Sequence, residues 1–301
     1  MNPIDHLMVS AIQLLPSPLV KPFAMRYIAG ETLNDAVSVV RSLNSDTLMS
    51  TLDVLGENSK TKEDTFLAAK ACEQVLHVID EQHLNANLSV KLTQLGLQID
   101  QELCYFNVRK ILEIAKGYKN FVRIDMEDSS TTSATLALYE RIRSEGFENT
   151  GVVIQASLRR SESDVKRLIE MKANVRLCKG AYVEPKALAF KSGEEIRLNY
   201  LKLLRMLLGG KCYVGIATHD DFLVSGASLS IQDMKLQRAD YEFQMLLGVK
   251  PNLRRSIVAD GHRLRVYVPF GEHWYTYSLR RFQENPRMAR YIVRALFSRK
   301  E

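Results

Sequence analysis

Eight short extended segments, each followed by a stretch of helical periodicity, limit the folds open to this chain more than any other feature. The segments span residues 48–55, 88–92, 121–126, 152–158, 175–177, 213–218, 240–246 and 264–268. Several are continuous apolar runs, which are typical of parallel strands covered on both faces. Eight strand–helix units predict an α/β fold with one closed (β/α)8 barrel, and no G-x-G-x-x-G segment favours an open dinucleotide-binding sheet.

The two ends of the chain depart from this repeat. Residues 1–47 contain helical stretches interrupted by Pro16, Pro18, Pro22 and Gly30. Residues 287–301 place several arginines beside an apolar stripe, a pattern suited to an anionic membrane surface or to packing on the barrel. We therefore expect an N-terminal helical cap over 1–47, a catalytic barrel over 48–286 and a basic amphipathic C-terminal helix over 287–301.

Composition and charge exclude several classes of protein. With 46% hydrophobic and 25% charged residues among 301, the chain is typical of a folded globular protein. No apolar run approaches the roughly 18 residues of a membrane-spanning helix, and the first residues do not resemble a secretory signal, so we expect a cytoplasmic protein. The four cysteines form no C-x-x-C pair, which is typical of reduced, buried thiols. The net charge of +6 favours an anionic partner without identifying it.

Polar residues stand at the carboxyl ends of all eight predicted strands, where (β/α)8 enzymes hold their active sites. In strand order they are Asp53 and Glu57, Lys91, Asp125 with Glu127 and Asp128, Gln155, Arg176 with residues 179–182, residues 218–220, Glu242 with Gln244, and Tyr267. Because barrel closure brings these ends to one mouth, carboxylates and cations gather there. Such a mouth predicts an active site.

The residue types alone leave several chemistries open at this mouth. A divalent-metal hydrolase would use Asp125, Glu127 and His219, although no H-x-H or H-E-x-x-H pair is present. A Schiff-base lyase would use Lys91 or Lys179 as its nucleophile. A redox enzyme would use the cations to hold an anionic substrate and a cofactor. A non-catalytic basic barrel that binds nucleic acid or a protein partner is a fourth class, but basic residues are not interleaved with aromatic ones outside the last helix.

A series of ordered motifs resembles the proline dehydrogenase family, whose members are distorted (β/α)8 barrels that use flavin adenine dinucleotide (FAD). The motifs are LDVLGE at 52–57, SVKL at 89–92, RIDMED at 123–128, VRLCKGAY at 175–182, ATHD at 217–220, YEFQMLLG at 241–248, VYVPFG at 266–271 and YSLRRFQEN at 277–285. They follow the family's order, with one motif at each matching strand. The resemblance implies the monofunctional bacterial type, with a helical cap before the barrel and a C-terminal helix over its mouth.

The same resemblance implies the reaction. L-Proline would lose a hydride from C5 to FAD, giving Δ1-pyrroline-5-carboxylate in the first step of proline catabolism, and the electrons would pass to a membrane quinone. We accordingly expect a cytoplasmic enzyme with peripheral contact at the inner face of the membrane, no nucleic-acid partner and no metal. In relatives that prefer hydroxyproline a small residue stands at the position of Tyr267, so the tyrosine favours proline.

Residue roles are carried over at the matching positions. The substrate-binding residues implied by the resemblance are Lys91, Arg280, Arg281, Tyr182, Leu246 and Glu57. In this scheme Lys91 and the two arginines hold the substrate carboxylate, and Glu57 pairs with Arg280 as an ion-pair gate that closes over bound proline. Tyr182, Leu246 and Tyr267 form the wall around the apolar ring.

The resemblance also implies catalytic and cofactor-binding residues. Asp125, Arg176 and Tyr267 are the implied catalytic residues, with Asp125 beneath the substrate site helping to orient Lys91. The implied cofactor contacts are Asp125, Gln155, Arg176, Lys179, Gly180, Ala181, Tyr182, Thr218, His219 and Glu284. Among them, Arg176 faces flavin N5 and Gln155 donates to the pyrimidine edge, while Gly180 allows close backbone approach and Lys179 offers charge to the phosphates. For His219 a purely structural role is the alternative.

Overall fold

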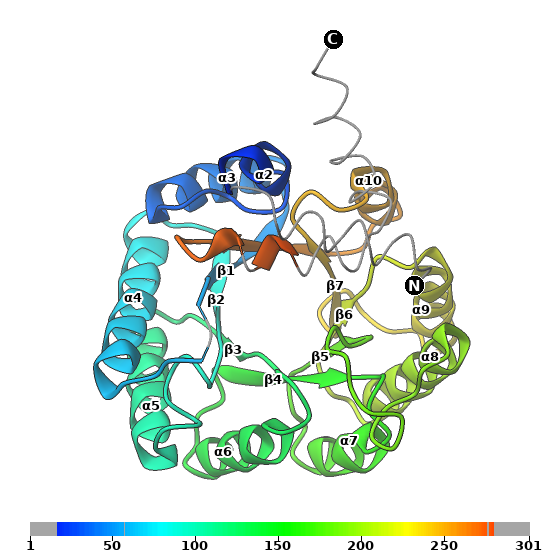
Figure 1. Ribbon diagram of the computed structural model, residues 1–301. Coiled ribbons are helices and arrows are strands. Elements are labelled where there is room, and N and C mark those ends of the chain that lie inside the picture. The colour runs from blue at the N-terminus through cyan, green and yellow to red at the C-terminus, as the bar shows by residue number, and fades with distance from the viewer. Residues whose placement is uncertain (1–16, 57, 276, 280–301) are drawn as a thin grey trace.

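The computed structural model describes residues 17–279 except Glu57 and Thr276, and these residues form a closed barrel of eight parallel strands in sequence order (Figure 1). The strands are β1 (Met49–Val54), β2 (Ala86–Val90), β3 (Val122–Ile124), β4 (Thr150–Gln155), β5 (Val175–Cys178), β6 (Val214–Ala217), β7 (Tyr241–Leu246) and β8 (Leu264–Phe270). Strand β8 closes the barrel on β1, with Met49 opposite Arg265 and Val54 opposite Phe270. The predicted (β/α)8 barrel is confirmed.

Seven helices follow the first seven strands and form a ring around the barrel (Figure 1). They are α4 (Lys62–Glu81), α5 (Gln101–Gly117), α6 (Thr132–Ser144), α7 (Ser161–Glu170), α8 (Gly193–Gly209), α9 (Asp221–Asp233) and α10 (Pro251–Ala259). Helices α4 and α8 each begin with a capping box. The side chains of Thr61 and Ser192 accept a hydrogen bond from the backbone N–H of the third helical residue, and the side chain of that residue accepts one from the backbone N–H of the cap. The apolar stripes of the seven helices pack on the outer faces of the strands in one continuous core.

Two further helices precede the barrel, α2 (Ser17–Ala24) and α3 (Leu33–Ser45). Helix α3 packs on β1 and β8 and buries Val37, Val40 and Leu43 in the same core as the strands. It therefore covers the outer face of the sheet where the barrel closes. The predicted boundary at residue 48 stays a prediction, and the C-terminal helix predicted over 287–301 lies outside the described residues.

A smaller apolar cluster ties α2 and the segment after it to the opposite end of the described chain. Val20, Tyr27 and Ile28 pack with Trp274 and Tyr277. The indole nitrogen of Trp274 also donates to Glu31 Oε1 at 2.8 Å. These contacts place the segment around residues 26–27 beside the barrel mouth. No helix in the described part of the chain has both the length and the apolar character needed to cross a bilayer.

The cysteines pack as small apolar side chains. Cys72, Cys104 and Cys212 are buried. Burial raises the pKa of the Cys72 and Cys104 thiols to about 12, which keeps them protonated near neutral pH. Cys178, at the end of β5, lines the cavity described next.

Candidate active site

A cavity of about 980 Å³ opens at the carboxyl ends of the strands. Residues in or just after β2 to β8 line it, together with Arg26 and Tyr27 from the N-terminal segment and Tyr277 from the segment after β8. Its volume lies near the upper end of the range of about 300–1,000 Å³ found for ligand pockets. It can therefore accept a ligand much larger than an amino acid.

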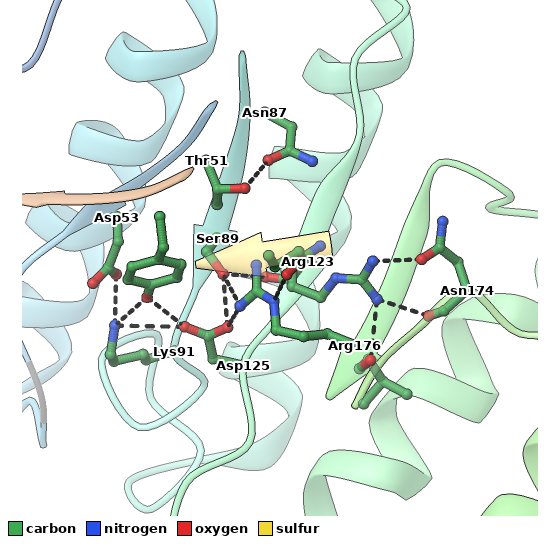
Figure 2. A network of polar contacts seen from close by, with 12 residues as sticks. Thr51, Asp53, Asn87, Ser89, Lys91, Arg123, Asp125, Asn174 and Arg176 are labelled. Atoms are coloured by element: carbon green, nitrogen blue, oxygen red, sulfur yellow. Dashed lines mark hydrogen bonds and ion pairs between the residues drawn. The ribbon is translucent and has the colours of Figure 1, made fainter. Parts of the chain in front are cut away.

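The cavity floor is a polar network that we call the floor cluster: Asp53, Lys91, Asp125, Arg176 and Tyr267. Figure 2 shows its four charged members side by side, and Asp53, Lys91 and Arg176 are buried. Lys91 Nζ lies 2.5 Å from Asp53 Oδ1 and 3.7 Å from Asp125 Oδ2. The Tyr267 hydroxyl donates to the same Asp125 oxygen at 2.8 Å. Arg176 Nη1 donates to the other Asp125 oxygen, Oδ1, at 2.7 Å. Asp125 therefore links Lys91 and Tyr267 on one side to Arg176 on the other.

Strand alternation explains how residues so far apart in sequence meet. Successive side chains of a strand point to opposite faces, so one residue in two faces the barrel interior. Asp53 stands opposite Ser89 in the register of β1 and β2, and Ser89 Oγ donates to Asp125 Oδ1 at 2.7 Å. The backbone N–H of Asp125 donates to Val90 O at 2.9 Å, which holds Asp125 in line beyond the end of β3.

Burial and charge act in opposite directions on the two floor carboxyls. Burial alone would raise the pKa of Asp125, but the guanidinium of Arg176 and the ammonium of Lys91 outweigh it and hold the pKa below its ordinary value. Burial raises the pKa of Asp53, against the attraction of Lys91. Burial, followed by the nearby carboxylates Asp125 and Asp53, raises the pKa of Tyr267 well above its usual value. Of the two carboxyls, Asp125 therefore ionises the more readily, and Tyr267 is a neutral donor.

A second group of charges, the rim cluster, consists of Lys179, Arg197 and Asp220. Arg197 Nε and Nη2 donate to the two oxygens of Asp220 at 2.8 and 3.1 Å, and Lys179 Nζ lies 3.2 Å from Asp220 Oδ2. The two cations are about half exposed, unlike those of the floor. Burial would raise the pKa of Asp220, but its hydrogen bonds with Arg197 and Lys179 lower it. The rim therefore presents cations whose carboxylate partner also faces the cavity.

The segment over residues 179–182 packs against the end of β4. Gly180 has a φ of 108°, and a Cβ added there would collide with Ser157 Oγ and lie 3.1 Å from Gln155 Oε1. Glycine is therefore required by packing within the protein itself. Farther along, Glu184 Oε1 accepts a hydrogen bond from the backbone of Ser129 at 2.7 Å, which fastens this loop to the loop after β3.

Three predicted residues have partners within the protein. Gln155 is buried, and its Nε2 donates to the Glu127 carbonyl at 2.7 Å. His219 Nε2 accepts from the Leu246 backbone at 2.8 Å, so the ring links the ends of β6 and β7, and the proton of its neutral form lies on Nδ1. Glu127 accepts from Thr93 N at 3.0 Å and Thr93 Oγ1 at 2.5 Å. These contacts support a structural role for His219, and this geometry does not favour Glu127 and His219 as metal ligands.

The structure brings most predicted site residues to one cavity. Its lining includes Lys91, Asp125, Arg176, Lys179, Gly180, Ala181, Tyr182, Thr218, His219, Leu246 and Tyr267. Gln155 lies behind the lining, against Gly180. Glu57, Arg280, Arg281 and Glu284 lie outside the described residues, so the gate and the arginine pair stay predictions.

For several residues of the site the sequence gives at most a position at a strand end and not the contact that the residue makes. Asp53 is the nearer carboxylate to Lys91, whereas the family resemblance implies that Asp125 orients that lysine. Gln244 stands out in the sequence only as a polar residue of a strand, yet it accepts from Arg176 Nε at 2.6 Å. Arg26 and Tyr27 have no signal at all, because they reach the mouth from the turn after α2, before the barrel begins.

The donor set fits a phosphate-containing dinucleotide. Arg176 lies at the floor, Lys179 and Arg197 lie at the rim, and the cavity volume exceeds the needs of a small acid alone. Guanidinium and ammonium groups are the side chains that bind phosphate and electron-rich rings.

Comparison with known proteins agrees with this geometry. The family model described as proline dehydrogenase matches residues 36–293. Proline dehydrogenase 1 of Bacillus subtilis (strain 168) is 37% identical over 276 residues, which cover 92% of this chain and 91% of that protein. Proline dehydrogenase of Deinococcus radiodurans is 33% identical over 282 residues, covering 91% of this chain and 89% of that protein.

A solved structure shares the fold. It is proline utilization A from Bdellovibrio bacteriovorus inactivated by N-propargylglycine, with a TM-score of 0.83 and 25% sequence identity. The match covers 89% of this chain and 33% of that chain, so this chain spans about a third of that larger protein.

Proposed function

The chain belongs to the proline dehydrogenase family, and from this premise we propose that it oxidises L-proline to Δ1-pyrroline-5-carboxylate with FAD as its cofactor and a quinone as electron acceptor. The main support is the floor cluster: two buried cations, Lys91 and Arg176, are joined through the ionised Asp125 at the bottom of a large cavity. Such an arrangement suits an anionic substrate beside an electron-rich ring.

The family resemblance assigns FAD to several residues that line the cavity. Arg176 would contact the flavin at the floor, and Lys179 would contact the phosphates from the rim, with Thr218 and His219 beside them. Bound there, FAD would supply the two-electron acceptor for the hydride that leaves C5 of proline. The exposed ion pairs of Lys179 and Arg197 with Asp220 are weak in water, so these cations can turn toward a phosphate at small cost.

Lys91 would hold the carboxylate of proline. Its ammonium is already fixed between Asp53 and Asp125, so little side-chain entropy is lost when substrate binds. Arg280 and Arg281 would supply further charge if the family scheme holds. Asp125 would keep Lys91 and Arg176 oriented, because it remains ionised between them.

Tyr267 would set the shape of the substrate pocket. Its hydroxyl is fixed on Asp125 at 2.8 Å, and the guanidinium of Arg176 lies 5.1 Å from the centre of its ring. The ring is held on two sides, so it forms a fixed wall with Leu246 and Tyr182. We expect proline to be preferred to 4-hydroxyproline, since a fixed wall leaves no room for an added hydroxyl.

A spectroscopic experiment tests this function. Purified protein supplied with FAD should be yellow, and L-proline should bleach its flavin absorbance under anaerobic conditions, with hydroxyproline and pipecolate much slower. Lys91→Met should raise the proline KM by at least about tenfold, because a charge-assisted bond to the carboxylate is lost. The exposed Lys172→Met is the matched control and should behave as wild type. Protein that takes up no FAD, or that proline does not bleach, would overturn the proposal.

The acceptor and the membrane contact need a separate test. A quinone dissolved in anionic vesicles should reoxidise the proline-reduced protein. A variant ending at Asn285 should lose vesicle binding if the basic C-terminal helix makes the contact. Equal vesicle binding by both forms would remove the membrane role of that helix.

A further inference from the structure

A second polar network lies below the floor cluster, and the reaction scheme above does not use it. Gln244 connects the two networks. Its Oε1 accepts from Arg176 Nε at 2.6 Å, and its Nε2 donates to Glu242 Oε1 at 2.7 Å. Glu242 and Gln244 are both buried and lie two residues apart on β7, so both face the barrel interior.

Glu242 is held as a charged acceptor. Arg265 Nε donates to its Oε1 at 2.7 Å, and the Tyr213 hydroxyl donates to its Oε2 at 2.8 Å. Burial would raise the pKa of Glu242, but Arg265 and these hydrogen bonds outweigh it and lower the pKa. The carboxylate is therefore ionised at neutral pH and can only accept hydrogen bonds.

This charge decides which way the Gln244 amide points. A glutamine amide has a donor end and an acceptor end, and only the donor end can face a carboxylate. With Nε2 turned to Glu242, Oε1 must face Arg176. The opposite orientation would place two oxygens together and turn the amide N–H groups toward the N–H of Arg176.

The neighbouring strand is shaped to admit this amide. Gly215 on β6 pairs with Glu242 in the register of β6 and β7, and a Cβ added at Gly215 would lie 2.5 Å from Gln244 Nε2 and 2.9 Å from its Cδ. Only glycine at position 215 leaves room for the Gln244 amide. The glycine is an observation independent of the hydrogen bonds, and it supports the same placement of Gln244.

The consequence falls on Arg176. Its Nε is held by Gln244. Its Nη1 is held by Asp125 and Ser89 from the other side of the barrel (Figure 2). Among the described residues none accepts a hydrogen bond from Nη2. The plane of the guanidinium is thus set from two sides, with one nitrogen left for a ligand.

We infer that Glu242 is a positioning residue, which acts through Gln244 to fix the guanidinium of Arg176 beneath the flavin. The inference rests on the proposed function, since it takes Arg176 as the flavin contact. The competing explanation is that Glu242 only neutralises Arg265 and Arg123, and that the Gln244 contact is incidental. Burial and the nearby Arg176 lower the pKa of Arg123 to about 9, so the interior is indeed crowded with positive charge.

The experiment measures the flavin environment rather than turnover. Sulfite adds to flavin N5 and produces an anionic adduct, so its affinity reports the cation held near the ring. With FAD-loaded protein we expect Gln244→Met and Glu242→Gln each to lower sulfite affinity by at least about tenfold, with a changed flavin spectrum. Gly215→Ala should shift both readouts the same way, although it removes no polar group.

One further variant separates positioning from general stability. Tyr213→Phe removes a hydrogen bond from the other oxygen of the same carboxylate, so it should lower the free energy of unfolding and leave sulfite affinity within about twofold.

The outcomes are distinct for the two proposals. If the wild type is bleached by proline and Gln244→Met keeps wild-type sulfite affinity and spectrum, the positioning role of Glu242 is wrong while the proposed function stands. The positioning role is equally wrong if Tyr213→Phe changes sulfite affinity as much as Glu242→Gln. A wild type that takes up no FAD overturns both proposals.

Discussion

The floor cluster and the rim cluster line the same cavity and use the same groups at similar distances, yet their surroundings differ. In the floor cluster the side chains of Asp53, Lys91 and Asp125 are 1%, 9% and 12% exposed. In the rim cluster the side chain of Asp220 is 8% exposed, but those of its partners Lys179 and Arg197 are 45% and 46% exposed. The closest N–O distances are 2.5 Å on the floor and 2.8 Å on the rim.

Exposure, more than distance, determines what these pairs can do. Water and salt screen the rim charges, so each pair contributes little to stability and its cations can change partners. The floor charges have lost their hydration, so removing one leaves its partner buried and unpaired. We therefore expect the floor to hold a fixed geometry and the rim to adapt to a bound ligand.

The largest difference should follow the loss of one lysine from each cluster. Lys91→Met leaves the buried Asp53 without its cation and removes one of the two cations beside Asp125, so the free energy of unfolding should fall by about 3–5 kcal/mol. Lys179→Met should lower it by less than about 1 kcal/mol. Urea unfolding of both variants measures this. Equal losses would show that exposure does not separate the clusters.

The second-largest effect should be on the pH dependence of the free energy of unfolding. The pKa of Asp125 lies below 3.8 in the folded protein, so its ionisation stabilises the fold above that value, and this contribution is lost as the pH falls through the lowered pKa. Asp125→Asn removes the contribution. Its free energy of unfolding should therefore be lower than wild type at neutral pH and fall less steeply on acidification. The check is urea unfolding at several pH values between about 3 and 7, where parallel curves would contradict it.

A smaller effect is expected within the floor cluster from a single hydroxyl. Tyr267→Phe removes the donor to Asp125 at 2.8 Å but keeps the ring, so stability should fall by about 1.5–3 kcal/mol. Because the ring is no longer held on Asp125, discrimination between proline and 4-hydroxyproline should weaken. The ratio of kcat/KM for the two substrates measures this. A ratio identical to wild type would mean that packing alone holds the ring.

The smallest effect should come from the rim carboxylate. Asp220→Asn should lower the free energy of unfolding by about 1 kcal/mol, since its carboxylate is buried but both cation partners stay half exposed, and roughly 1 M salt should reduce the difference. The variant should bind FAD at least as tightly as wild type at low salt, since Lys179 and Arg197 lose a competitor for the phosphates. Titration with FAD at two ionic strengths tests this, and a large loss of affinity would show that Asp220 orients the cations for the cofactor.

Most of the fold could be predicted from the sequence. All eight extended segments became strands of one barrel, because continuous apolar runs between amphipathic helices have few other ways to bury both faces. The ends of the strands differ from the predicted bounds by a few residues. The predicted segment 152–158 became Thr150–Gln155, since the chain turns at Ala156 to begin the loop before α7. The placement of α3 on β1 and β8 had no local signal, because it depends on where the barrel closes.

The sequence predicts most of the residues that line the site, but it predicts few of the contacts between them. Lys91, Asp125, Arg176 and Tyr267 stand at or near strand ends, where the barrel topology requires a common mouth. Arg26 and Tyr27 could not be found, since no periodicity shows that the turn after α2 lies at the barrel mouth. Gly215 is a signal that could have been noticed: a glycine inside a predicted strand indicates that another group approaches closely.

The sequence by itself determined the number of strands, their order and the residues that face inward, because these follow from local periodicity and the burial of apolar side chains. Only the tertiary structure decided which carboxylate pairs with which cation. Lys91 and Asp53 are 38 positions apart, and Tyr267 and Asp125 are 142 positions apart. Their contacts depend on strand register and on the closure of β8 against β1, and both arise from hydrogen bonds between backbone segments that are distant in the chain.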